Sequence, residues 1–336
     1  MIKVLTTLGP TSLNKKTVEG LEQRGVSLFR INLSHTNIEE VDALIDKIRS
    51  WSGVPICIDS EGAQVRNGSM VSESVKYGLN NLVSISRDKK VGNEKIISLT
   101  PASVFDQLSM GDEIRIDFNS VCLKVIKLEK DIVTCKVIHE GHVGSNKAVT
   151  INKIIHLPAI TPKDEAAFRI GIDKGIENFA LSFTNRADDV RAVRKIIGEK
   201  NLIAKIESIE GVLNLKEILP LVQQILIDRG DLSREVSIEK IPFLQRRIIS
   251  FANKFEVPVY VATNLLESMT VNKGPTRAEA NDVASTLLMG ARGLVLAAET
   301  AIGKYPTESV DIINAIIREY SAWSPKLSLK KIIEGS

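Results

Sequence analysis

The apolar run LIAKIES, residues 202–208, carries two opposite charges that face the same way. Lys205 and Glu207 are two positions apart, and in a β-strand residues i and i+2 point to one face. Burying charge costs free energy unless the charges pair or bind a ligand. A lone Lys-x-Glu on a strand is more often a local ion pair than a catalytic pair, so its meaning depends on its neighbours.

Polar residues also follow most of the other apolar runs in the chain. They are Arg30, Asn32, Ser34 and His35; Asp59, Ser60 and Glu61, followed by Arg66; Asp228, Arg229 and Asp231; Thr263 and Asn264; and Glu299 and Thr300. Each has an ordinary explanation when taken alone; His35, for example, is typical of a hydrogen-bonded loop histidine. Together, so many cations, carboxylates and hydroxyls at strand ends indicate an active site.

The residue types indicate the chemistry. Glu207 and Asp231 offer the hard oxygen ligands that Mg²⁺ or Mn²⁺ prefers. Lys205 and Arg30 add positive charge suited to a phosphate or carboxylate. Gly230, in the stretch RGDLS, lies at a predicted strand-to-helix turn whose N–H groups can hold a carboxylate. The set predicts a metal-dependent site for a small, doubly anionic substrate, and either phosphoryl transfer or enolate chemistry.

Eight short apolar runs are predicted to position these residues. They span 3–9, 27–34, 54–60, 178–183, 202–208, 224–231, 258–264 and 293–299. The runs are nearly continuous and rich in β-branched residues, which is typical of strands buried on both faces. Helical patterns lie between most of them, for example at 14–25, 164–175 and 307–323. The alternation predicts an α/β fold, a (β/α)8 TIM barrel, whose active site lies at the carboxyl ends of the strands.

One segment interrupts this alternation. Residues 68–157 contain short alternating stretches such as DEIRIDF, VCLKVIKLE and DIVTCKVIHEG, with no long helix between them. We interpret them as a small antiparallel β-barrel domain inserted after the third barrel strand. The predicted barrel domain is then 1–67 and 158–336. An insertion at this end of a barrel is a position where lids occur.

The overall composition excludes several classes of protein. The 336 residues are 43% hydrophobic and 25% charged, with a net charge of +3, which is typical of an ordinary soluble globular chain and gives no reason to expect nucleic-acid binding. Cys57, Cys122 and Cys135 lack the spacing of a zinc site or a disulfide framework, which favours a reducing compartment. No signal peptide or membrane span is evident, so we expect a cytoplasmic protein that does not contact membrane.

Long motifs in order resemble the pyruvate kinase family over nearly the whole chain. They are TTLGPTS, GVSLFRINLSH, DSEGAQVRNG, GSNKAV, LPAITPKDEAAFRIGIDKGIENFALSF, AKIESIEGVLNLKEI, DRGDLSREVSIEKIPFLQRRI, VATNLLESMTVNKGPTRAEANDVAS and AAETAIGKYPTESV. The resemblance implies a cytoplasmic glycolytic kinase that makes pyruvate and ATP from phosphoenolpyruvate and ADP with Mg²⁺ or Mn²⁺. The family's C-terminal domain has no counterpart before Ser336.

The resemblance also implies roles for individual residues. Lys205 would stabilise the transferring phosphoryl group, Arg30 would contact the phosphate, and Thr263 would lie near the proton-donor relay. The remaining implied sites are the divalent-cation ligands Glu207 and Asp231, the carboxylate pocket Gly230, Asp231 and Thr263, the monovalent-cation ligands Asn32, Ser34, Asp59 and Ser60, and the nucleotide-binding residues His35, Arg66 and Lys147.

Several positions depart from the family's pattern. The lysine of Asp-Thr-Lys-Gly-Pro-Glu is Glu61, the proline is Ala63, and the glutamate associated with potassium dependence is Gln64. In the inserted domain, Phe118 replaces the second aspartate of Asp-Asp-Gly. Ala297 replaces a serine associated with the proton relay.

These departures leave alternatives open. An active short pyruvate kinase ranks first, ahead of a paralogue that uses the metal-enolpyruvate platform on another substrate. A non-catalytic binding protein is disfavoured, because drift would not spare costly buried charges. A metal-dependent aldolase or lyase would not need the inserted domain.

Potassium stimulation is expected, helped by the charge of Glu61 unless that side chain faces solvent or pairs with a lysine such as Lys147. NKGPTRAEANDVAS resembles the family's barrel-pairing segment and implies a homodimer, unless it only caps a surface helix.

Overall fold

The computed structural model describes residues 1–62, 64–117 and 119–334. The chain divides into two compact units, one formed by Met1–Gly62 with Ala159–Ser336 and the other by Ala63–Pro158. The second unit begins a few residues before the expected position 68, because Arg66–Asn67 form strand β4 and pair with a strand of the insertion. Ala63 and Phe118 lie outside the described residues.

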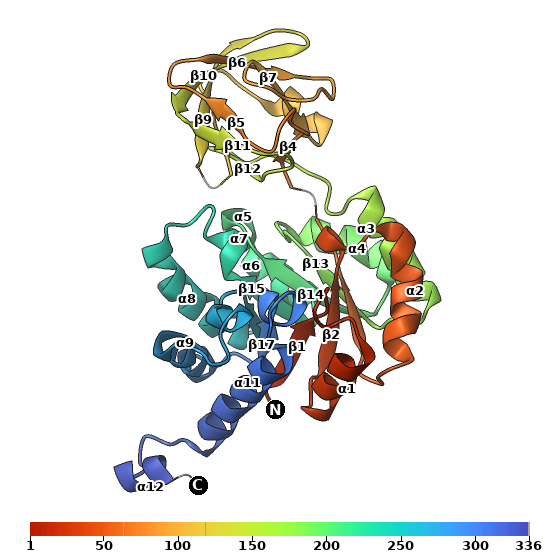
Figure 1. The fold of residues 1–336 in the computed structure, drawn as a ribbon, viewed down its shortest axis with the longest axis vertical. Helices are drawn as coiled ribbons and strands as arrows, with labels where there is room; N and C mark the ends of the chain where they lie inside the picture. The colour runs from red at the N-terminus through yellow and green to blue at the C-terminus, as the bar shows by residue number, and fades with distance from the viewer. Residues whose placement is uncertain (63, 118, 335–336) are drawn as a thin grey trace. The chain divides into compact units, whose positions relative to one another are not determined.

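The first unit is a closed barrel of eight parallel strands, which confirms the predicted fold (Figure 1). The strands are β1 (Lys3–Thr7), β2 (Leu28–Asn32), β3 (Ile56–Asp59), β13 (Asn178–Leu181), β14 (Asn201–Ile206), β15 (Gln224–Asp228), β16 (Val259–Ala262) and β17 (Gly293–Leu296). Neighbours follow the order β1-β17-β16-β15-β14-β13-β3-β2, so the first and last strands of the chain close the barrel.

Helices follow the barrel strands along the chain. They are α1 (Lys15–Gln23), α2 (Ile38–Arg49), α3 (Pro162–Asp173), α4 (Ala187–Ile197), α5 (Ile209–Leu213), α6 (Leu215–Ile218), α7 (Arg229–Leu232), α8 (Ile241–Asn253), α9 (Arg277–Leu288), α10 (Ala298–Ala301), α11 (Pro306–Ala322) and α12 (Leu329–Glu334). Apolar residues of most of these helices and the outer faces of the strands form one large core, whereas Leu329, Ile332 and Ile333 of α12 are exposed. No helix among the described residues is long and apolar enough to span a membrane.

The second unit is the predicted inserted β domain. Its strands are β4 (Arg66–Asn67), β5 (Val75–Tyr77), β6 (Leu82–Ser86), β7 (Ile96–Thr100), β8 (Glu113–Ile116), β9 (Val121–Leu128), β10 (Ile132–His139), β11 (Gly141–Val143) and β12 (Val149–Ile151). Seven of them form one sheet that is antiparallel except for the β6–β7 pair, while β5 and β11 pair separately. A bridge between Arg66 and Ala148 joins the two edges of the large sheet, around a core of its own.

Candidate active site

The barrel interior carries an apolar layer with a polar layer directly beyond it. The apolar layer consists of Leu5, Leu28, Cys57, Ala180, Ile203, Leu226, Tyr260, Ala262 and Val295. Because side chains alternate along a strand, residues two positions further on face the interior again. At six of the eight strand ends these residues are polar, namely Thr7, Arg30, Asp59, Ser182, Lys205 and Asp228. The site therefore lies at the carboxyl ends of the strands.

Two buried cations share one buried carboxylate in this polar layer. Arg30 Nη1 lies 3.0 Å from Asp59 Oδ2 and Lys205 Nζ lies 3.4 Å from the same oxygen. Arg30 Nε also donates to Thr7 Oγ1 at 2.8 Å. The ion pairs offset much of the desolvation cost of burying these groups. The two cations thus lie close enough to bind one anionic group together.

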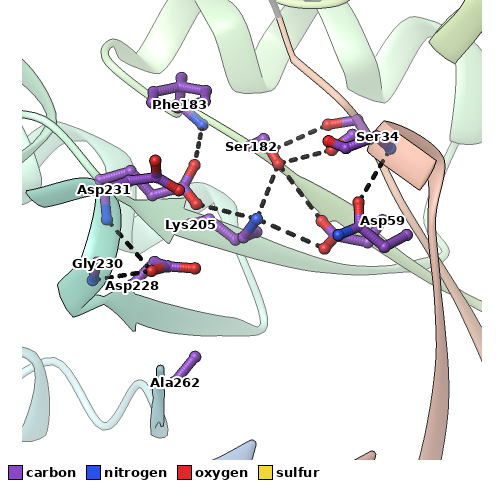
Figure 2. Close-up of polar contacts among 12 residues, drawn as sticks. Ser34, Asp59, Ser182, Phe183, Lys205, Asp228, Gly230, Asp231 and Ala262 are labelled. Carbon is purple, nitrogen blue, oxygen red and sulfur yellow. Dashed lines mark hydrogen bonds and ion pairs between the residues drawn. The ribbon is translucent and has the colours of Figure 1, made fainter. Parts of the chain in front are cut away.

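Ser182 joins this network, and the sequence analysis did not assign it a role. Lys205 Nζ donates to Ser182 Oγ at 2.9 Å (Figure 2). Ser182 Oγ in turn donates to the carbonyl of Ser60 at 2.6 Å. The hydroxyl therefore holds the ammonium group at the end of β13. The i+2 alternation from Ala180 was the signal in the sequence that places Ser182 in the interior.

Three carboxylates gather beside Lys205. Glu207, Asp228 and Asp231 each offer an oxygen that lies within 4.8 Å of the others. Glu207 Oε2 accepts a hydrogen bond from Phe183 N at 2.6 Å. Its Oε1 lies 2.9 Å from Lys205 Nζ in an ion pair but accepts no hydrogen bond of good geometry within the described residues. The donor set, all carboxylate oxygen, fits a hard divalent cation such as Mg²⁺ or Mn²⁺.

Burial is the main influence on the pKa of Glu207 in this cluster. Burial raises the pKa of the Glu207 carboxyl to about 8, against the influence of Lys205 and with the help of Asp228 and Asp231. Burial lowers the pKa of Lys205, but Asp59, Glu207 and Asp228 together raise it above its usual value. Lys205 is therefore a permanent cation at neutral pH. A carboxyl that ionises reluctantly among like charges gains stability from a bound metal cation.

Gly230, Asp231 and Thr263, the residues predicted to bind a substrate carboxylate, lie together beside the carboxylate of Asp228. Gly230 N donates to Asp228 Oδ1 at 3.1 Å, and Asp231 N lies 3.4 Å from the same oxygen. Thr263 Oγ1 accepts from Gly230 N at 2.9 Å, donates to the carbonyl of Ala262 at 2.6 Å and lies 3.2 Å from Asp228 Oδ1. Figure 2 shows the two backbone contacts at the start of α7. The sequence analysis had noted Asp228 without giving it a function.

The predicted monovalent-cation ligands lie at the adjacent ends of β2 and β3, where Asn32 pairs in register with Asp59. Several of their oxygens already have partners. Asn32 Oδ1 accepts from Ser34 N at 3.0 Å, and Ser60 Oγ accepts from Ser182 N at 2.9 Å. The structure thus places the four residues in one region, and Asp59 there serves the buried cations.

Glu61, the charge reversal noted in the sequence, pairs with a lysine of the same unit. Lys163 Nζ lies 3.4 Å from Glu61 Oε2 and donates to the carbonyl of Leu33, between Asn32 and Ser34. Lys147, the lysine considered from sequence, lies 3.3 Å from Asp117 within the inserted domain. Lys163 therefore offsets the negative charge that was expected to favour potassium.

The predicted nucleotide-binding residues are distributed over both units. His35 is exposed at the end of the 3-10 helix η1 (Leu33–His35) of the barrel. In the inserted domain, Arg66 donates to the carbonyl of Asn146 at 2.9 Å and to Gln64 Oε1 at 3.2 Å, next to Lys147. The structure therefore brings Arg66 and Lys147 together.

At the end of the eighth strand the interior position is apolar, because Ala297 lies where six other strands have a polar residue. Ala297 donates its N–H to Glu299 Oε2 at 2.9 Å, and the buried Glu299 also accepts from Leu266 N at 3.0 Å. Thr300 donates to the carbonyl of Thr7 at 2.9 Å. Glu299 and Thr300 thus support the backbone where β17 meets β1 and β16, and their polar groups are engaged in that role.

Comparison with known proteins identifies relatives of the whole barrel and insertion. A family model described as pyruvate kinase, barrel domain, matches residues 1–310. The chain is 34% identical to a pyruvate kinase of Bacillus licheniformis, over 99% of this chain and 59% of the relative. It is 35% identical to one of Dictyostelium discoideum, over 94% of this chain and 66% of the relative.

A more complete match in length comes from Thermococcus litoralis. Its pyruvate kinase is 33% identical over 98% of this chain and 72% of the relative. The chain thus spans less than two thirds of the length of the Bacillus and Dictyostelium relatives.

Proposed function

The chain belongs to the pyruvate kinase family, and from this membership and the site geometry we propose that it transfers a phosphoryl group between phosphoenolpyruvate and ADP. The observation that carries the proposal is the pair of buried cations beside a carboxylate cluster. Arg30 and Lys205 meet at Asp59, and Lys205 also contacts Glu207. This combination suits a phosphoryl group whose oxygens gain negative charge as it moves.

In this proposal each side chain has a definite task. Arg30 binds the phosphoryl oxygens, and Lys205, held by Ser182, stabilises the charge on the transferring group. Glu207 and Asp231 hold the divalent cation, which when bound neutralises phosphate and enolate oxygen charge. Thr263 lies at the end of β16, where its hydroxyl contacts Gly230 N, near the place where the enolate carbon would receive a proton.

The nucleotide and monovalent-cation sites complete the proposal. His35, Arg66 and Lys147 bind the nucleotide phosphates. Asn32, Ser34, Asp59 and Ser60 supply oxygens for potassium. Both assignments derive from the family resemblance, and the adjacent positions of β2 and β3 support the second.

A second candidate function is supported by a specific observation. Asp228 accepts hydrogen bonds from the backbone groups proposed to bind the substrate carboxylate. A family member that uses the same metal platform on a different substrate would tolerate such a side chain. The buried, ion-paired Lys205 and Glu207 disfavour a non-catalytic binding protein. Their desolvation lowers the stability of the fold, and a protein without catalysis would have no reason to keep them.

The test is an assay of pyruvate formation from phosphoenolpyruvate and ADP with Mg²⁺, at constant ionic strength, with and without K⁺. Turnover that requires the metal and ADP is the expected result. A control protein, Lys205→Met, separates this activity from contaminating kinase. If purified wild-type protein and Lys205→Met form pyruvate equally, or neither does, the assignment fails and the second candidate takes its place.

A further inference from the structure

We infer that Asp228 is a specificity-determining residue, whose carboxylate takes the position that a substrate carboxylate would otherwise take. This inference rests on the proposed function, because it concerns how the same site receives phosphoenolpyruvate. It predicts that the wild-type chain binds carboxylate-bearing ligands more weakly than the same site would without this side chain.

The contacts of a single oxygen carry the inference. Asp228 Oδ1 lies 3.1 Å from Gly230 N and 3.4 Å from Asp231 N, and Thr263 Oγ1 lies 3.2 Å away. Those three groups are the ones that the family resemblance assigns to the substrate carboxylate. An incoming carboxylate must therefore displace the Asp228 oxygen or leave these groups unused.

The local backbone keeps Asp228 in this position. Asp228 caps α7 by accepting two N–H groups of its own turn. Because this contact is intramolecular, it does not incur the entropy loss that a substrate carboxylate incurs when it binds from solution. Thr263 on the other side has a φ of +68°, a strained conformation for a β-branched residue. Arg229 holds it, since Nη2 and Nε both donate to the Thr263 carbonyl, at 2.6 and 3.1 Å.

Charge repulsion also disfavours binding of a substrate carboxylate in this pocket. Asp228 is 6% exposed and offers an oxygen within 4.8 Å of oxygens of Glu207 and Asp231. A substrate carboxylate that entered the pocket would approach a third carboxylate in addition to the two proposed metal ligands. Like charges at such distances repel in a poorly solvated site.

Two substitutions separate occupancy from charge. Asp228→Ala removes both the oxygen and the negative charge, whereas Asp228→Asn removes the charge and keeps an acceptor at the same place. Binding of phosphoenolpyruvate and of pyruvate is measured by calorimetry in the presence of Mn²⁺, and the affinity for Mn²⁺ alone is measured by electron paramagnetic resonance. Asn14→Ala, which removes the side-chain cap of α1, is the control for loss of a helix cap.

The inference expects Asp228→Ala to bind both carboxylates about tenfold more tightly than wild type, the gain of one hydrogen bond to a charged group. Asp228→Asn should gain less, and Asn14→Ala should not differ from wild type. Equal gains in the alanine and asparagine proteins would attribute the effect to charge alone and overturn the inference.

Other outcomes are equally decisive. If Asp228→Ala weakens Mn²⁺ and both carboxylates together, Asp228 is only a third metal ligand and the inference is wrong. If wild type and Asp228→Ala bind phosphoenolpyruvate equally, the inference fails while the proposed function stands. If no variant binds either carboxylate, the proposed function fails along with it.

Discussion

Glu207 lies between one cation and two carboxylates, and its role as a metal ligand can be tested by removing only its charge. Glu207→Gln keeps the size and the contact with Phe183 N but loses the anionic oxygen. Loss of supporting groups around a metal typically costs 10–100-fold, so we expect loss of a direct ligand to reduce metal-dependent turnover by more than about a hundredfold. Steady-state kinetics against Mg²⁺ concentration measure the effect.

The control for this substitution is Glu217→Gln, an exposed glutamate on α6, which should behave as wild type. Circular dichroism should show that both proteins are folded. Near-normal activity of Glu207→Gln at ordinary Mg²⁺ concentration would show that the site is wrongly assigned.

Glu61 tests the link between local charge and potassium. Its carboxylate is paired with Lys163, whose ammonium group also contacts the Leu33 carbonyl. Glu61→Lys would place two cations side by side near Asn32 and Ser34, and Coulomb repulsion would disfavour a bound K⁺. We expect weaker stimulation of turnover by K⁺ at constant ionic strength, with Glu61→Gln intermediate. A flat response to K⁺ in wild type and in both variants would contradict the prediction.

Helix α3 begins where the chain returns to the barrel, and one buried carboxylate organises that junction. Asp164 accepts hydrogen bonds from Glu61 N at 2.7 Å and from Gly62 N at 3.2 Å. It also accepts from Thr161 N and Thr161 Oγ1, and its backbone N–H donates to Thr161 Oγ1, which completes a capping box. The end of the segment after β3 and the start of α3 are therefore connected through one side chain.

Removing this carboxylate should be costly. Asp164→Ala leaves buried N–H groups without an acceptor and removes the cap, so we expect the free energy of unfolding to fall by about 3 kcal/mol. Urea unfolding followed by circular dichroism measures it. Asp173→Ala, at the exposed far end of the same helix, should change stability by less than about 0.5 kcal/mol. Equal effects of the two substitutions would mean that the Asp164 contacts contribute nothing.

Helix α9 is the element on which the homodimer prediction depends. Thr276 and Glu279 form a capping box at its start, and Glu279 also accepts from Ser268 N and Ser268 Oγ. These contacts give PTRAE a local structural role, and pairing of two barrels remains a separate prediction. We expect a homodimer of this chain in sedimentation experiments. A strict monomer or a stable tetramer would contradict it.

Across the whole molecule, all three cysteines are buried. Burial raises the pKa of Cys57, with a further contribution from Asp59, raises that of Cys135 to about 12, and raises that of Cys122. Because the thiolate is the reactive form, we expect no reaction of the native protein with a thiol reagent at pH 8. All three should react after unfolding in denaturant, and rapid labelling of the native protein would contradict the prediction.

The same shifts determine a pH dependence of stability. Above pH ~8.5 the unfolded chain releases thiol protons that the folded chain retains. The unfolded state then binds fewer protons, so the free energy of unfolding should fall as the pH rises from ~8.5 toward 12. Replacing Cys135 with valine should reduce this slope, as urea unfolding at several pH values would show. An unchanged slope would contradict the assignment.

The sequence by itself determined the features that depend on local periodicity. Continuous apolar runs alternating with helical patterns predicted the barrel, and short alternating runs predicted the insertion. The i, i+2 spacing predicted that Lys205 and Glu207 face the same way, and in the structure Lys205 Nζ lies 2.9 Å from Glu207 Oε1. Such features follow from the chain's own geometry, because side-chain direction repeats along each strand.

Only the tertiary structure decided which distant groups meet. Glu61 pairs with Lys163, about a hundred residues away in the chain. Ser182 holds Lys205 across neighbouring strands, and Arg30 and Lys205 meet at Asp59 from three different strands. These contacts depend on strand register and on competition among several possible partners for each charge. Neither is encoded in a local pattern, because the free energy of a buried charge depends on everything packed around it.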